Sequence, residues 1–186
     1  MRDPRRVAIL ISGRGSNMKA LAEQAQGYEV VLVASNKPLA PGLEWARAAG
    51  LPTWAWDSKG VDKQEFDRIL SEALDDHQVG TIALAGFMRI LSSWFTAEWH
   101  GRIVNIHPSL LPKYRGLDTH SRAIAAGDPV SGCSVHLVTE ELDAGEILGS
   151  AEVQIEPGDT VESLEKRVLA AEHLLYPKVL SEFVSR

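Results

Sequence analysis

The sequence predicts an α/β fold, a single domain built on a mostly parallel, twisted sheet with helices on both faces. Short apolar runs of strand length alternate with stretches of helical spacing or composition. This alternation is typical of right-handed strand-helix-strand units, whose sheets are covered on both faces. The chain has 186 residues and 45% hydrophobic content, which suits one compact domain with a sizeable core, expected over residues 1–186.

Five apolar runs predict the parallel strands, at residues 7–11, 30–34, 52–56, 81–85 and 103–106. Helices are predicted between them, at residues 17–25, 42–49 and 63–76. After Pro112 the chain enters a loop rich in charge and glycine, residues 113–118. Two further strands, 134–138 and 147–153, enclose the segment 139–145, and a long final helix begins near Thr160. Because ligands of open α/β sheets bind outside the carboxyl ends of the strands, the functional site is expected there.

Composition excludes several classes of protein. The net charge of −6 argues against general nucleic-acid binding, although a site for a phosphorylated metabolite can still be locally positive. The lone cysteine, Cys133, has no partner for an internal disulfide, and a Cys-x-x-Cys pair is absent from the sequence. The basic residues 1–6 precede an apolar stretch too short for a signal peptide or a membrane span. We therefore expect a cytoplasmic enzyme.

A glycine-containing loop, residues 12–17, leads from the first strand into a helix, where backbone amides bind phosphate well. Met18 replaces the third glycine of a dinucleotide fingerprint, and residues 35–36 at the end of the second strand are Ser-Asn, so NAD binding is not expected. A nucleoside-triphosphate loop is excluded because no Gly-Lys-Ser/Thr triplet follows. Two alternatives remain, an ordinary tight turn with a capping side chain or a monophosphate cradle made by Gly15, Ser16 and Asn17.

The exit of the fourth strand, residues 86–91, is apolar with one charge. Such a wall, with its polarisable Met88, suits a flat aromatic heterocycle. The alternative is a buried connection between sheet and helix, from which Arg89 extends its charge to solvent.

Asn105 and His107 stand two residues apart where the fifth strand enters a proline-rich loop. Side chains at this spacing in a strand face the same way, so both can reach one reacting atom. An uncharged donor beside a group that carries a proton can stabilise an oxyanion and then protonate it, which favours acyl-type transfer. The alternative is a strand end whose Asn caps a turn and whose His is an ordinary core residue.

The acidic segment 140–145 carries Asp143 just before a glycine, in a loop between two strands. A carboxylate placed beside His107 would favour the protonated imidazole, whereas the alternative is a solvated acidic turn. No metal site is expected, because the following four histidines lack the spacing of a ligand pair: His100, His107, His120 and His136.

The chain resembles the phosphoribosylglycinamide formyltransferases of purine biosynthesis over nearly its whole length. Four segments show this resemblance together: the Gly-x-Gly-Ser-Asn loop and residues 85–91, 105–112 and 141–145. The Asn-x-His motif and the later Asp are shared by the wider folate-dependent formyl-transfer superfamily, and the Gly-Ser-Asn loop resembles the glycinamide ribonucleotide branch. The resemblance implies a Rossmann-like domain. It also implies a catalytic trio made of Asn105, His107 and Asp143.

The resemblance further implies two binding regions. The ribonucleotide would be held by Gly15, Ser16 and Asn17 at its 5′-phosphate and by Glu172 at its ribose. The folate would be held by Lys63, Met88, Arg89, Ile90, Leu91 and Asn105. The chain differs from some members at Leu169, where they carry a polar substrate contact, and it ends at Arg186 without the C-terminal extension of several members.

The function that follows from the resemblance is transfer of the formyl group of 10-formyltetrahydrofolate to the amine of glycinamide ribonucleotide. No separable cofactor and no metal are expected, and the partners are small molecules rather than nucleic acid or membrane; whether the protein is a homodimer is left open. Alternatives are transfer to methionyl-tRNA or an amino sugar nucleotide, whose enzymes usually carry an extra C-terminal domain, and hydrolysis of the folate, whose enzymes usually carry an N-terminal regulatory domain. A non-catalytic nucleotide-binding module would need the phosphate loop but not the catalytic trio.

Overall fold

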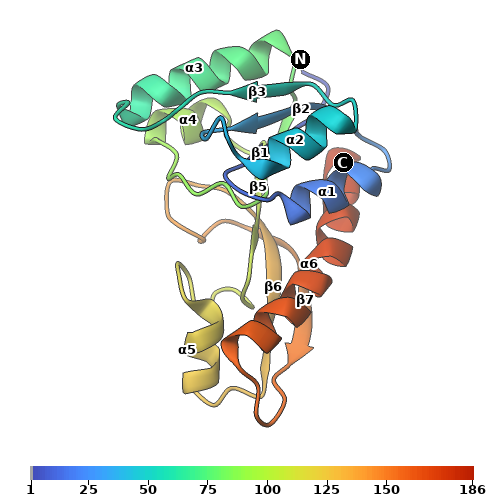
Figure 1. Ribbon diagram of the computed structural model, residues 1–186, viewed down its shortest axis with the longest axis vertical. Coiled ribbons are helices and arrows are strands. Elements are labelled where there is room, and N and C mark those ends of the chain that lie inside the picture. Colours follow the sequence, from blue (N-terminus) through green and yellow to red (C-terminus); the bar gives the residue numbers. More distant parts are fainter. Residues whose placement is uncertain (1) are drawn as a thin grey trace.

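The computed structural model describes residues 2–186, so residue 1 of the predicted domain lies outside it. Its sheet has the strand order β3-β2-β1-β4-β5-β6-β7 (Figure 1). The strands are β1 (Arg6–Ile11), β2 (Glu29–Ser35), β3 (Thr53–Ala55), β4 (Thr81–Leu84), β5 (Ile103–His107), β6 (Val130–Leu137) and β7 (Ile147–Gln154). The helices are α1 (Ser16–Glu23), α2 (Pro41–Ala48), α3 (Lys63–Asp76), α4 (Ser93–Glu98), α5 (Thr119–Ala125) and α6 (Val161–Val184). Strands β1 to β5 pair in parallel and β6 and β7 are antiparallel, which confirms the predicted fold class.

Helices cover both faces of the sheet, as predicted. Alternate residues of β1 point to opposite faces because the side chains of a strand alternate. Val7, Ile9 and Ile11 pack in one core with residues of α1, α2 and α6. Ala8 and Leu10 pack in a second core with residues of α3 and α4. Within residues 2–186, no helix has both the length and the apolar character that crossing a membrane requires.

The sequence did not predict α4 or α5, and it placed the start of β6 too late. Both helices are short, six and seven residues, so they give little periodic signal. Strand β6 begins at Val130 rather than at residue 134, and residues 131–133, which follow Val130, are small. Gly132 is required in this part of the strand, because a Cβ atom there would lie 2.0 Å from the Ala151 carbonyl oxygen of β7.

Helix α6 runs beside β6 and β7 (Figure 1), and it also contacts α1. Its first turn is fixed by a capping box in which Thr160 and Ser163 bond each other's backbone N–H groups. The buried Tyr176 hydroxyl lies 3.0 Å from the carbonyl oxygens of Leu84 and Val104. This one side chain therefore ties α6 to β4 and β5, the strands that lead into the predicted site.

Replacing Tyr176 with Phe should lower the free energy of unfolding by about 1 to 3 kcal/mol, because it leaves buried carbonyl oxygens without their side-chain donor. Urea denaturation measures the loss. The matched control is Tyr114→Phe, which removes a hydroxyl that bonds the carboxylate of Asp128 at a partly exposed position. Equal losses in the two variants would contradict the role assigned to Tyr176.

Candidate active site

A cleft of about 660 Å³ opens at the carboxyl ends of the strands, where the sequence predicted the site. Strand β5, the segment after β4, helix α5 and helix α6 all contribute to it. Its lining residues are Asn17, Gly86, Phe87, Met88, Asn105, Ile106, His107, Pro108, Gly116, Leu117, Asp118, Thr119, His120, Ser121, Val161, Glu165, Leu169 and Glu172.

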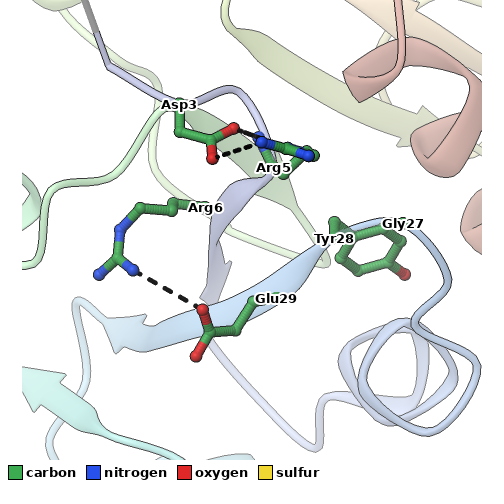
Figure 2. A pocket seen from close by; sticks show the side chains of 6 residues that line it. All are labelled: Asp3, Arg5, Arg6, Gly27, Tyr28 and Glu29. Atoms are coloured by element: carbon green, nitrogen blue, oxygen red, sulfur yellow. Dashed lines mark hydrogen bonds and ion pairs between the residues drawn. The ribbon is translucent and has the colours of Figure 1, made fainter.

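A second hollow lies at the amino ends of β1 and β2 (Figure 2). Its charged side chains are already paired: Arg5 donates two side-chain hydrogen bonds to Asp3, and Arg6 lies 3.6 Å from Glu29. None of the residues predicted to act in catalysis or binding lines this hollow. The cleft at the carboxyl ends is therefore the candidate active site.

The pairing of β5 with β6 aligns the polar residues of the cleft. Asn105 is paired with His136 and His107 with Ser134 in the antiparallel register, so directly opposed side chains share a face. The Ser134 hydroxyl donates to the Ser109 carbonyl oxygen at 2.8 Å and thereby holds the turn that follows β5. The rigid strand pair, together with this turn, fixes the positions of Asn105 and His107.

His107 and Asp143 meet, as the resemblance to formyltransferases implied. His107 Nδ1 lies 3.4 Å from Asp143 Oδ2, and both side chains are only 7% exposed. His107 Nε2 lies 2.9 Å from the Tyr114 carbonyl oxygen. Both neighbours are acceptors, so an imidazole protonated at both nitrogens donates to each of them. The alternative of a solvated acidic turn is wrong for Asp143.

The Asp143 carboxyl stays ionised despite its burial. Burial by itself raises its pKa, but the Gly116 N–H donating at 2.9 Å and the charge of His107 hold the pKa below its usual range. Asp143 also has a positive φ of 50°, an uncommon conformation that Asp tolerates better than most residues. The loop thus presents a negative charge to His107.

The predicted phosphate loop has a backbone suited to anion binding. Gly15 adopts the left-handed conformation with φ of 72°, and α1 begins at the next residue. The first N–H groups of a helix lack acceptors within the helix and attract anions. Asn17 lines the cleft, whereas Gly15 and Ser16 are not among its lining residues.

Asn17 and Glu172, both predicted to bind the ribonucleotide, contact each other in the cleft. Asn17 Nδ2 donates to Glu172 Oε2 at 2.7 Å, while Asn17 Oδ1 is buried without a partner among residues 2–186. Burial raises the pKa of Glu172 to about 6, although the bond from Asn17 opposes the rise. Glu172 is therefore a buried carboxyl that titrates close to neutral pH.

Of the predicted folate-binding residues, the cleft brings together Met88 and Asn105. The Met88 N–H donates to Ser12 Oγ at 2.7 Å, and this hydroxyl donates in turn to Asn36 Oδ1 at 2.6 Å. Ser12 therefore anchors Met88 to the ends of β1 and β2.

The other four predicted folate residues do not line the cleft as it stands. Leu91 is buried and Ile90 is exposed. Arg89 is directed to the carbonyl oxygens of Ser58 and Val61, each at 3.3 Å. Lys63 is the first residue of α3. Contact of these residues with folate stays a prediction.

Several site residues escaped the sequence reasoning: Ser12, His120, Ser134, His136 and Glu165. Ser134 and His136 repeat the spacing of Asn105 and His107, so two polar residues two apart in a predicted strand were a usable signal. His120 and Glu165 line the cleft from α5 and α6. Among residues 2–186, no group of three or more His, Cys, Asp or Glu side chains is placed to hold a metal ion.

A parallel α/β sheet with a carboxamide and a buried imidazole-carboxylate pair at one cleft has the equipment of an enzyme of acyl-type transfer. The family described as Formyl transferase matches residues 5–180, and the chain belongs to this family.

Individual relatives show which members of this family the chain is similar to. The chain is 43% identical to the phosphoribosylglycinamide formyltransferase of Escherichia coli (strain K12), with 95% of this chain and 86% of that protein covered. It is 47% identical to the trifunctional purine biosynthetic protein adenosine-3 of Drosophila melanogaster, covering 97% of this chain but only 14% of that longer protein. The crystal structure of the Brucella melitensis phosphoribosylglycinamide formyltransferase superposes with a TM-score of 0.92 at 48% identity, covering 98% and 96% of the two chains. The resemblance seen in the sequence is confirmed.

Glu172→Gln tests the buried carboxyl. Because the pKa of Glu172 is raised from 4.5 to about 6 on folding, its ionisation costs the folded state free energy above pH 6 and nothing below pH 4.5. The variant should therefore gain up to about 2 kcal/mol of unfolding free energy relative to the unmodified protein near pH 8, and the gain should vanish near pH 4. Urea denaturation at both pH values measures it.

The exposed Glu182 lies on the same helix, so Glu182→Gln is the matched control and should show no pH-dependent gain. A gain for Glu172→Gln that is equal at the two pH values would show that ionisation of Glu172 is not its cause.

Proposed function

We propose that the protein transfers the formyl group of 10-formyltetrahydrofolate to the amine of glycinamide ribonucleotide, giving N-formylglycinamide ribonucleotide and tetrahydrofolate. The observation that carries the proposal is the buried contact between His107 and Asp143, since His107 lines one cleft together with Asn105, Asn17 and Glu172. The names of the relatives support the same reaction. In this proposal the domain spans residues 1–186, the enzyme is cytoplasmic and acts on small molecules, and a homodimer remains an open alternative.

In the proposed mechanism, the ribonucleotide amine attacks the formyl carbon, and the carbonyl oxygen becomes an oxyanion. Asn105 donates an N–H to this oxygen, and protonated His107 stabilises the same charge. His107, as the general acid, protonates the folate nitrogen through Nε2, the nitrogen that lies 2.9 Å from the Tyr114 carbonyl oxygen. The bond from the formyl carbon to the folate nitrogen then breaks, and the neutral imidazole takes up the proton that the attacking nitrogen releases. Asp143 stabilises the positive charge that His107 carries before and after this exchange, since its own carboxyl is ionised.

Binding divides between the two ends of the cleft in this proposal. The N-terminus of α1, with Gly15, Ser16 and Asn17, holds the 5′-phosphate, and Glu172 accepts hydrogen bonds from ribose hydroxyls. Fixing the ribonucleotide at both points orients its amine for attack. The folate ring lies against Met88 and Asn105, and the following residues are the further predicted contacts of the folate: Lys63, Arg89, Ile90 and Leu91.

One assay tests the function directly. The purified protein is mixed with 10-formyltetrahydrofolate and one acceptor at a time, and the absorbance change of the folate is followed. Turnover is expected with glycinamide ribonucleotide and not with methionyl-tRNA, an amino sugar nucleotide or water alone. Turnover without any amine would instead identify a hydrolase.

Gly15→Ala tests the phosphate site. The added Cβ would lie 2.6 Å from Met18 Cε, so that side chain must move, and the positive φ of Gly15 strains the backbone of any residue with a Cβ. The KM for the ribonucleotide should rise about fivefold, which corresponds to roughly 1 kcal/mol of lost anion binding, while the KM for folate stays nearly constant. Gly50→Ala is the matched control, because Gly50 has a φ of 75° but open space around it. Equal changes in both KM values would contradict the assignment.

Asp143→Asn tests the charge that faces His107. Without this charge nothing opposite Nδ1 stabilises the protonated imidazole, so kcat/KM at neutral pH should fall at least about tenfold. Glu141→Gln removes a negative charge from the same loop, but that carboxylate is exposed and paired with Arg115, so its kcat/KM should not change. An unchanged kcat/KM in Asp143→Asn would mean that His107 works without this carboxylate.

A further inference from the structure

His136 is a buried histidine that lies directly beside Asn105. It stands opposite Asn105 in the antiparallel register of β5 and β6 and is only 2% exposed. Its Nε2 atom lies 3.2 Å from Asn105 Nδ2. The same Nε2 atom lies 3.5 Å from Asp143 Oδ1. His136 therefore touches two members of the proposed catalytic trio and is itself outside the cleft lining.

The neighbours of the His136 ring determine which nitrogen carries the hydrogen. Nδ1 lies 2.9 Å from the Leu137 carbonyl oxygen, which only accepts, so Nδ1 carries a hydrogen. In the neutral ring Nε2 is then an acceptor, and it faces the Asn105 carboxamide nitrogen, which only donates. A hydrogen on Nε2 would place two donors 3.2 Å apart. The neutral ring with its hydrogen on Nδ1 satisfies both of these closer contacts.

We propose that His136 is a positioning residue for formyl transfer, which fixes the orientation of the Asn105 carboxamide by accepting a hydrogen bond from its nitrogen. The inference rests on the proposed function of Asn105 as the oxyanion donor. A carboxamide can turn by half a rotation and exchange its nitrogen and oxygen at little cost in shape. With the oxygen turned toward the oxyanion, Asn105 would repel the charge that it has to stabilise.

The carboxamide nitrogen has two hydrogens, so the bond to His136 leaves one for the ligand in the cleft. Asp143 Oδ1 lies farther from His136 Nε2 than the Asn105 nitrogen does. The other carboxylate oxygen, Asp143 Oδ2, accepts a hydrogen bond from Gly116 N and lies 3.4 Å from His107 Nδ1. His136 thus acts on the reaction through Asn105, without contacting either substrate.

Two substitutions separate this role from a merely structural one. A glutamine amide reaches the position of histidine Nε2 and can offer an acceptor there, whereas an asparagine amide reaches only the position of Nδ1. In His136→Asn, kcat should fall at least about tenfold, with the KM of each substrate changed by less than about twofold. His136→Gln should restore kcat to within about threefold of the unmodified enzyme. Exposed His100, replaced by Asn, is the control for loss of a histidine.

A double-mutant cycle completes the test, with circular dichroism and folate-analogue binding used to select folded variants. When Asn105 is already Ala, His136→Asn should lower kcat by less than about threefold, because no carboxamide is left to orient. Equal losses for His136→Asn and His136→Gln, or losses that multiply in the double variant, would overturn the proposal while leaving the reaction assigned. Full activity of Asn105→Ala would overturn both this proposal and the role proposed for Asn105.

Discussion

The antiparallel pairing of β5 with β6 is the constraint on which the active-site cleft depends. The parallel part of the sheet brings β5 to the cleft, but it is the reversed β6 that places His136 and Ser134 opposite Asn105 and His107. The loop after β6 then places Asp143 beside His107, with 3.4 Å between Asp143 Oδ2 and His107 Nδ1. The loop backbone packs closely against the end of β6 at Gly145. Glycine is required there, because a Cβ atom would lie 1.9 Å from the Leu137 carbonyl oxygen. A slip of one residue in this register would turn the β6 side chains of His136 and Ser134 to the other face of the sheet.

Two buried carboxyls of the cleft are shifted in opposite directions by their surroundings. Glu172 has one amide donor from Asn17 and is otherwise desolvated, so its pKa rises to about 6. Asp143 is also buried, but the Gly116 N–H and the charge of His107 face it, so its pKa falls. Near pH 6 the candidate site therefore holds a fixed negative charge at Asp143 and a titrating one at Glu172. Buried groups with such divided behaviour are typical of functional sites.

The sequence predicted the parallel sheet and the same-face placement of Asn105 and His107, because both follow from local periodicity. It could not establish the partner of Asp143 from spacing alone, and the resemblance to formyltransferases supplied that partner. The bond between Asn17 and Glu172 joins residues 155 positions apart, which no local pattern reveals. Arg89 shows the same limit: the sequence indicated only an apolar run with one charge, and the structure directs that charge to backbone carbonyls of a neighbouring loop. Long-range contacts of this kind depend on how elements pack, so they required the structure.

The rim of the cleft supports the proposed position of the folate. Met88 is 69% exposed and Leu117 73% exposed, although both line the cleft and the cores hold many smaller apolar side chains in full burial. Exposed apolar side chains that gather at a cleft commonly mark a surface that a ligand covers. Burial of apolar area contributes roughly 25 cal/mol per Å², so a flat heterocycle laid across these two side chains gains affinity without requiring any charge nearby. The rigid pair of β5 and β6 then holds Asn105 and His107, whose proposed roles require a fixed geometry. The apolar rim binds the heterocycle through contacts that tolerate small displacements of the ring.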